Sequence, residues 1–208
     1  LEMGVIKEVQ DAEYFSYPVI AARKIDGVYK PLSRFCIDLR PTNLLAKTHY
    51  ASSLQIPKVS SIFDSIGRII GQSAEVWFAR LDLQNAYHNI RMDPDSQWST
   101  NFWANDKIYT WTAMPFGLSV APGIFQRAMR TTLYGLTGPN GFLSIYLDDV
   151  VLTSGSFEAL LRNVEHVFFR LKLAGIVLSA KKCIIGGSEI DLLGFKMNKL
   201  GVAVDPMK

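Results

Sequence analysis

Residues 142–152 read Phe142-Leu143-Ser144-Ile145-Tyr146-Leu147-Asp148-Asp149-Val150-Val151-Leu152, an apolar stretch that two adjacent carboxylates interrupt. Apolar runs of roughly four to eight residues are typical of buried strands, and Asp favours tight turns. The stretch therefore predicts a β-hairpin with Asp148 and Asp149 at the turn. Taken alone, the pair is equally compatible with an ordinary turn that has no chemical role.

A third carboxylate, Asp82, lies in a second apolar run, residues 76–83. A single buried Asp is most often a salt-bridged core residue, because an uncompensated carboxylate is costly to bury. Three such acids on two strands are explained directly by divalent cations, since oxygen ligands suit Mg²⁺. If the two strands are neighbours, the carboxylates converge. They would then form a two-metal site of the kind that polymerases and nucleases use for phosphoryl transfer.

The remaining pattern predicts an α+β fold in which helices back an antiparallel sheet. A hairpin is expected around the turn signal Asp26-Gly27, with strands at 17–22 and 34–39. Residues 41–57, bounded by two prolines, are expected to form a loop. Helical spacing of apolar residues occurs in three segments, 59–70, 119–133 and 156–174, and short strands are expected from residue 176 onward.

The composition excludes several classes of protein. The 208 residues are 49% hydrophobic, which is incompatible with a disordered chain and sufficient for a buried core. The net charge of +3 does not by itself indicate nucleic acid. Two cysteines, Cys36 and Cys183, are expected to be reduced thiols. No apolar stretch is long enough to cross a bilayer, and zinc, P-loop and dinucleotide-binding motifs are all missing from the sequence.

The chain resembles reverse transcriptases in blocks that follow the family's order. Tyr146-Leu147-Asp148-Asp149 is similar to the family's Tyr-x-Asp-Asp box. The other similar blocks are Arg34-Phe35-Cys36-Ile37-Asp38-Leu39-Arg40-Pro41-Thr42-Asn43, Leu81-Asp82-Leu83-Gln84-Asn85-Ala86-Tyr87-His88-Asn89-Ile90, Met114-Pro115-Phe116-Gly117-Leu118-Ser119-Val120-Ala121-Pro122-Gly123-Ile124-Phe125-Gln126 and Leu193-Gly194-Phe195. The sequences of these blocks most resemble those of gypsy-type LTR retrotransposons, with pararetroviruses as close relatives.

This resemblance implies a right-handed polymerase fold that consists of fingers and palm, with the thumb absent from these 208 residues. Residues 1–75 and 91–113 would be the two parts of the fingers. Residues 76–90 would be the palm strand with the first catalytic Asp, and residues 114–208 the palm with the active-site hairpin and primer grip. Since Leu1 is not Met and no stop signal precedes Lys208, we expect a segment of a longer Pol polyprotein.

The resemblance also implies roles for individual residues. Asp82, Asp148 and Asp149 would be the catalytic, metal-binding triad, and Leu83 would add a backbone carbonyl oxygen. Tyr146, Leu147 and Gly194 would lie against the template-primer. The expected nucleotide contacts are Lys24, Arg34, Tyr87, Phe116 and Gly117. Arg23 or Lys30 could take the place of Lys24, and Tyr87 would exclude a ribose 2′-hydroxyl.

The function implied is RNA-directed DNA polymerisation with two Mg²⁺ ions, for which Mn²⁺ could substitute. The expected partners are RNA and DNA templates, a primer strand, dNTPs, and the RNase H and integrase of the same polyprotein, with no membrane. The expected location is the cytoplasm, within a virus-like particle. The alternatives are a pararetroviral reverse transcriptase, a non-catalytic domesticated nucleic-acid-binding remnant, and an RNA-dependent RNA polymerase, which more often carries Gly-Asp-Asp at the hairpin.

Overall fold

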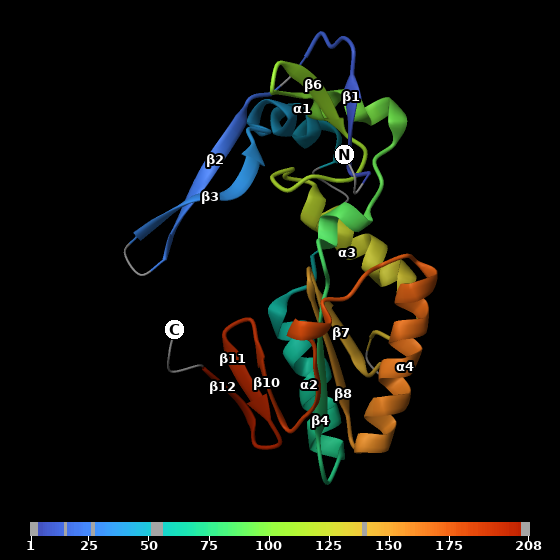
Figure 1. Cartoon of the computed structure of the whole chain (residues 1–208). Helices are drawn as coiled ribbons and strands as arrows, with labels where there is room; N and C mark the ends of the chain where they lie inside the picture. The colour runs from blue at the N-terminus through green and yellow to red at the C-terminus, as the bar shows by residue number, and fades with distance from the viewer. Residues whose placement is uncertain (1–3, 15, 26–27, 51–55, 139–140, 205–208) are drawn as a thin grey trace. The chain divides into compact units, whose positions relative to one another are not determined.

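The structure is a computed structural model that describes residues 4–14, 16–25, 28–50, 56–138 and 141–204. The chain divides into two compact units, each assembled from two segments (Figure 1). The first unit comprises residues 1–54 and 87–122, and the second comprises residues 55–86 and 123–208. Among the described residues, no helix combines the length and the apolar character that a membrane crossing requires.

The first unit contains a three-stranded antiparallel sheet and a separate two-stranded hairpin. The sheet order is β1-β6-β5, with β1 at Ile6–Val9, β5 at Phe102–Ala104 and β6 at Lys107–Trp111. The hairpin consists of β2 (Pro18–Ile25) and β3 (Val28–Ile37). The described residues of this unit also form helix α1 (Arg40–Tyr50) and two 3₁₀ helices, at Ala86–Asn89 and Pro94–Thr100.

The second unit is built on a four-stranded antiparallel sheet in the order β7-β8-β4-β9. The strands are β4 (Trp77–Asp82), β7 (Leu143–Tyr146), β8 (Asp149–Ser154) and β9 (Ile184–Gly187). Its helices are α2 (Val59–Gln72), α3 (Ala121–Thr132) and α4 (Phe157–Leu173). A second antiparallel sheet contains β10 (Glu189–Leu192), β11 (Phe195–Asn198) and β12 (Gly201–Val204).

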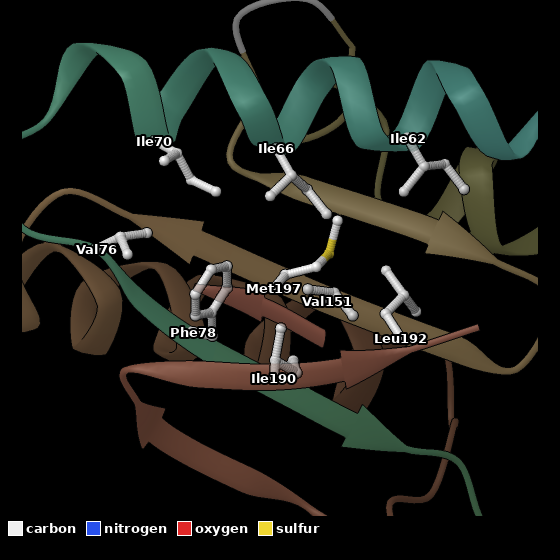
Figure 2. Close-up of a cluster of buried hydrophobic side chains, with 9 residues drawn as sticks. All are labelled: Ile62, Ile66, Ile70, Val76, Phe78, Val151, Ile190, Leu192 and Met197. Atoms are coloured by element: carbon white, nitrogen blue, oxygen red, sulfur yellow. The ribbon is translucent and has the colours of Figure 1, made fainter. Parts of the chain in front are cut away.

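Both faces of the four-stranded sheet are buried. On one face, Ile62, Ile66 and Ile70 of α2 project onto Phe78 and Val151, as Figure 2 shows. The same cluster includes Val76 and, from the small sheet, Ile190, Leu192 and Met197. Because side chains alternate along a strand, the neighbours Ala79, Leu81, Val150 and Leu152 point to the other face, where they are fully buried. Helix α4, which contacts β4 and β8, covers that face with Leu160, Val164, Val167 and Leu171.

The observed elements confirm the α+β class, the antiparallel sheet and the three predicted helices. The predicted loop over residues 41–57 is wrong over its first part, where α1 forms. Pro41 occupies the first turn of that helix, where its missing N–H needs no acceptor. The predicted turn at Asp26-Gly27 lies outside the described residues.

The unit boundaries fall at residues 54/55, 86/87 and 122/123, whereas the sequence suggested 75/76, 90/91 and 113/114. The largest difference between the two divisions concerns α2, which the resemblance places in the fingers. In the structure α2 belongs with β4, because its isoleucines form part of the core beneath the sheet. The assignment of these units to fingers and palm stays a prediction.

Candidate active site

The predicted aspartate hairpin is present in the second unit. Strands β7 and β8 pair antiparallel with Tyr146 opposite Asp149, so Leu147 and Asp148 form a two-residue turn. Leu147 has a φ of +54°, in the left-handed region that two-residue hairpin turns demand. A non-glycine residue in this conformation is uncommon and is held by its surroundings.

Asp82 and Asp149 lie side by side on neighbouring strands. Asp82 is the last residue of β4, and its Cα partner on β8 is Asp149. Asp148 is exposed at the turn, whereas the other two carboxylates are half-buried. Within the described ranges, no three His, Cys, Asp or Glu side chains are close enough to hold a metal ion. The structure therefore brings two of the three predicted carboxylates together and leaves the third at the hairpin tip.

The electrostatics of this pair favour a cation. Burial raises the pKa of the Asp149 carboxyl above its ordinary value, and the negative charges of Asp148 and Asp82 raise it further. The nearby guanidinium of Arg80 opposes that rise. Carboxylate oxygens are the ligands that Mg²⁺ and Mn²⁺ take in proteins. A divalent ion would relieve the repulsion that raises the Asp149 pKa, so these residues fit the metal that the sequence predicted.

The side chain of Gln126 holds the hairpin through hydrogen bonds to its backbone, a role that was not predicted from the sequence. Its side chain, on α3, is 1% exposed. Its Nε2 donates to the carbonyl of Ile145 at 3.0 Å, and its Oε1 accepts from the backbone N–H of Leu147 at 2.7 Å. These bonds satisfy two backbone groups on either side of Tyr146. The available signal was a polar residue between Phe125 and Met129 of a predicted apolar stripe.

A chain segment that precedes β9 holds the end of β4. The backbone N–H of Ser179 donates to the carbonyl of Asp82 at 2.9 Å. The thiol of Cys183 accepts from the Asp82 N–H at 3.4 Å. The ammonium of Lys182 lies 3.5 Å from Asp82 Oδ1. Leu83, predicted to offer a backbone carbonyl, pairs with Leu178 as an isolated bridge. These contacts join residues about a hundred positions apart, so no local sequence pattern predicts them.

Three of the predicted nucleotide contacts lie together in the first unit. The rings of Tyr87 and Phe116 are 5.2 Å apart, and the Phe116 side chain is 55% exposed. Gly117 has a φ of +96°, which favours glycine. Asn43 holds this turn, because its Nδ2 donates to the Gly117 carbonyl at 2.9 Å and its Oδ1 accepts from the Ser119 N–H.

His88 supports the same aromatic group. Its ring lies 5.1 Å from that of Phe116 and 5.2 Å from that of Trp111. Burial lowers the pKa of the His88 imidazole, which favours the neutral form. Its Nε2 is buried with no hydrogen-bond partner in the described part of the chain, and the same holds for Trp111 Nε1.

The predicted triphosphate contacts lie on the β2–β3 hairpin of the first unit. In its backbone register, Lys24 pairs with Tyr29, Arg23 pairs with Lys30, and Arg34 pairs with Ala21. Only the backbone of these residues is described. The nucleotide roles of the basic residues therefore stay predictions.

Gly194 lies in the turn between β10 and β11 in the second unit. Leu193 and Gly194 have φ values of +54° and +85°, as a type I′ turn requires at both central positions. Leu193 and Tyr146 both pack against the core cluster of α2. The predicted primer-grip turn and the active-site hairpin are thus anchored to one core.

Comparison with protein families gives a match to "Reverse transcriptase (RNA-dependent DNA polymerase)" over residues 22–197. The chain is 31% identical over 175 residues to a retrovirus-related Pol polyprotein from transposon 412 of Drosophila melanogaster, covering 84% of this chain and 13% of that protein. It is 31% identical over 200 residues to an enzymatic polyprotein of Cestrum yellow leaf curling virus, covering 95% of this chain and 29% of the relative. The chain thus spans less than a third of these relatives.

Solved structures give the same result for the fold. The foamy viral protease-reverse transcriptase in complex with dsDNA matches with a TM-score of 0.77 and 25% identity, covering 99% of this chain and 39% of that one. A second foamy viral structure, of the dRH form with ds DNA, matches with a TM-score of 0.76 and 26% identity, covering 99% of this chain and 33% of that chain. The described α+β elements are therefore similar to part of a reverse transcriptase.

Proposed function

The chain belongs to the reverse transcriptase family, and we propose that it is the part of a Pol polyprotein that carries out RNA-directed DNA synthesis. In this reaction the 3′-hydroxyl oxygen of a primer attacks the α-phosphorus of a dNTP. The bond between the α-phosphorus and the bridging oxygen breaks, pyrophosphate leaves, and the hydroxyl proton is lost. The observation that carries the proposal is the register that places Asp82 beside Asp149.

Asp82 and Asp149 would hold two Mg²⁺ ions or their Mn²⁺ substitutes, with Asp148 and the Leu83 carbonyl as further oxygen donors. Bound metal would lower the pKa of the attacking hydroxyl and neutralise charge on the leaving phosphates. The half-buried position of Asp149 supports this role, because its charge lacks full solvation until a cation arrives.

The nucleotide would be bound by groups from the first unit. Arg34, together with Lys24 or its alternatives Arg23 and Lys30, would contact the triphosphate, since basic side chains pair well with phosphate oxygens. Tyr87 would exclude a ribose 2′-hydroxyl, and its packing on Phe116 supports a fixed ring position. The left-handed turn at Gly117 would let the backbone come close to the nucleotide.

Template and primer would contact Tyr146, Leu147 and Gly194. The foamy viral relatives were solved with dsDNA and with an RNA/DNA hybrid, which supports both kinds of duplex as partners. RNase H and integrase of the same polyprotein are the further partners we propose. Both transposon and plant-virus polyproteins are among the relatives. We propose that the chain comes from a gypsy-like retrotransposon and that the enzyme works in the cytoplasm, inside a virus-like particle. A pararetroviral enzyme is the alternative.

Template-directed extension of oligo(dT) on poly(rA) with Mg²⁺ tests the polymerase role, using the chain within its full polyprotein. Asp149→Asn should reduce extension by about a hundredfold or more, because the residue holds the metal directly. Asp64→Asn is the matched control, since Asp64 is an exposed carboxylate on α2 of the same unit. Full activity of Asp149→Asn would contradict the proposal. Preference for NTPs over dNTPs would favour an RNA-dependent RNA polymerase. If the unaltered protein incorporates neither dNTPs nor NTPs, a non-catalytic remnant is favoured.

A further inference from the structure

The carboxylate of Asp82 has a cationic side chain beside it. Lys182 Nζ lies 3.5 Å from Asp82 Oδ1, whereas no ion pair joins a cation to Asp148 or Asp149 in the described ranges. Lys182 ends a three-residue 3₁₀ helix, Ala180–Lys182, just before β9. The lysine thus supplies positive charge at the carboxylate where the proposed function expects a metal.

The backbone around Asp82 does not depend on this ion pair. The Ser179 N–H and the Cys183 thiol hold the carbonyl and the N–H of Asp82. The Lys182 side chain is 69% exposed and that of Asp82 is 33% exposed. An exposed pair of this kind is weak. The ammonium can therefore move into solvent while β4 and the Asp82 carboxylate stay in place.

We propose that Lys182 is a placeholder cation, which pairs with Asp82 in the metal-free protein and leaves the carboxylate when a divalent cation binds. The inference rests on the proposed metal site. The ammonium carries one charge and lies near one carboxylate, whereas a divalent ion carries two charges and would be held by both Asp82 and Asp149. The metal therefore gains more Coulomb energy and displaces the lysine. The competition weakens metal binding and keeps Asp82 compensated until the metal arrives.

Calorimetric titration of the full chain with Mn²⁺ alone measures the competition. Lys182→Met should bind Mn²⁺ about two- to fivefold more tightly than the unaltered protein, the factor expected for loss of one exposed ion pair. Lys181→Met is the matched control, because it removes a neighbouring charge that makes no ion pair with Asp82. Equal Mn²⁺ affinities of the two lysine variants would overturn the proposal.

Amine labelling followed by mass spectrometry measures the departure of the lysine. Lys182 should be acetylated about twofold or more faster in Mn²⁺ than in EDTA, because an amine that has left the Asp82 carboxylate is more accessible to the reagent, while Lys181 should not change. Asp149→Asn should abolish the Mn²⁺ effect. If Mn²⁺ binds but the rate of Lys182 acetylation is the same in Mn²⁺ and in EDTA, the placeholder role is overturned. Absence of Asp149-dependent Mn²⁺ binding overturns the metal site itself, and the placeholder role with it.

Discussion

The backbone N–H of Leu147 donates a hydrogen bond of 2.7 Å to the side-chain oxygen of Gln126. Leu147 is the turn residue with the left-handed φ, directly before Asp148 and Asp149. A buried side chain from a different element, α3, therefore helps to hold the backbone of the turn that precedes both carboxylates.

Replacement of that side chain should impair catalysis beyond its effect on stability. Gln126→Leu keeps a similar volume but leaves the Ile145 carbonyl and the Leu147 N–H without partners, at a cost of about 1–3 kcal/mol in the free energy of unfolding. Small displacements of catalytic groups reduce the reaction rate strongly. Primer extension per folded molecule should therefore fall on the order of tenfold to a hundredfold. Gln97→Leu removes another buried glutamine, whose side chain donates to the Met92 carbonyl, and should cost stability only. Equal activity of the two folded variants would count against Gln126.

Asp149→Asn should stabilise the protein in the absence of divalent metal, although it reduces activity by about a hundredfold or more. The pKa of Asp149 is raised above 3.8, so the native carboxyl holds a proton that the unfolded chain has already lost. Stability then falls as pH rises from about 3.8 through the native pKa, and the asparagine variant avoids this loss. In EDTA at pH 7 its melting temperature should be higher, by up to about 2–4 °C for a gain of at most about 1 kcal/mol. The difference between the two proteins should shrink toward pH 3.5, and a constant difference would show that Asp149 is not the titrating group.

Tyr87→Val should relax discrimination between deoxynucleotides and ribonucleotides. In the proposed sugar-gate role, the smaller side chain would leave room beside the Phe116 ring for a 2′-hydroxyl. The ratio of kcat/KM for rNTPs to that for dNTPs should rise about tenfold or more. Tyr134→Val, at an exposed position of the second unit, is the control and should leave the ratio unchanged. An unchanged ratio in Tyr87→Val would exclude the sugar-gate role.

His88 should make the first unit sensitive to mild acid. Burial lowers its pKa below the ordinary value of 6.5, so the unfolded chain binds a proton that the native imidazole resists. The contribution of His88 to stability is complete above pH 6.5 and is lost as pH falls below it toward the native pKa. Urea unfolding at pH 7.5 and pH 5.5 should show a smaller loss for His88→Phe than for the unaltered protein. His166→Phe, on the outer part of α4, is the control, and an equal loss in all three proteins would contradict the prediction.

The hairpin at Tyr146-Leu147-Asp148-Asp149 could be predicted because its information is local. An apolar run with two turn-favouring acids has few other solutions. Buried carboxylates on two strands predicted that β4 and β8 are adjacent, since one cation site could then compensate their charges. The register of Asp82 with Asp149 confirms that the strands are neighbours. The contacts of Gln126 and Lys182 could not be predicted in this way, since they join distant segments through side chains that have no periodic pattern.

One element, α1, contradicts the prediction from the sequence. Pro41 favours a loop in the sequence, although a proline in the first turn of a helix is compatible with α1. The apolar surface that Ile62, Ile66 and Ile70 of α2 contact could not be predicted from the sequence either. Only the packed core identifies that surface, because periodicity tells which face of a helix is buried but not what buries it.

The division of each unit between two chain segments has a consequence for synthesis on the ribosome. The first unit includes residues up to 122, and the four-stranded sheet needs β9 near the end of the described chain. Strand β4 therefore leaves the ribosome well before either of its neighbours, with apolar residues and unpaired backbone groups on both edges. Such nascent strands are prone to wrong pairing and aggregation. We expect β4 to stay without its sheet partners until β8 has been synthesised, and the sheet to be complete only once β9 has followed.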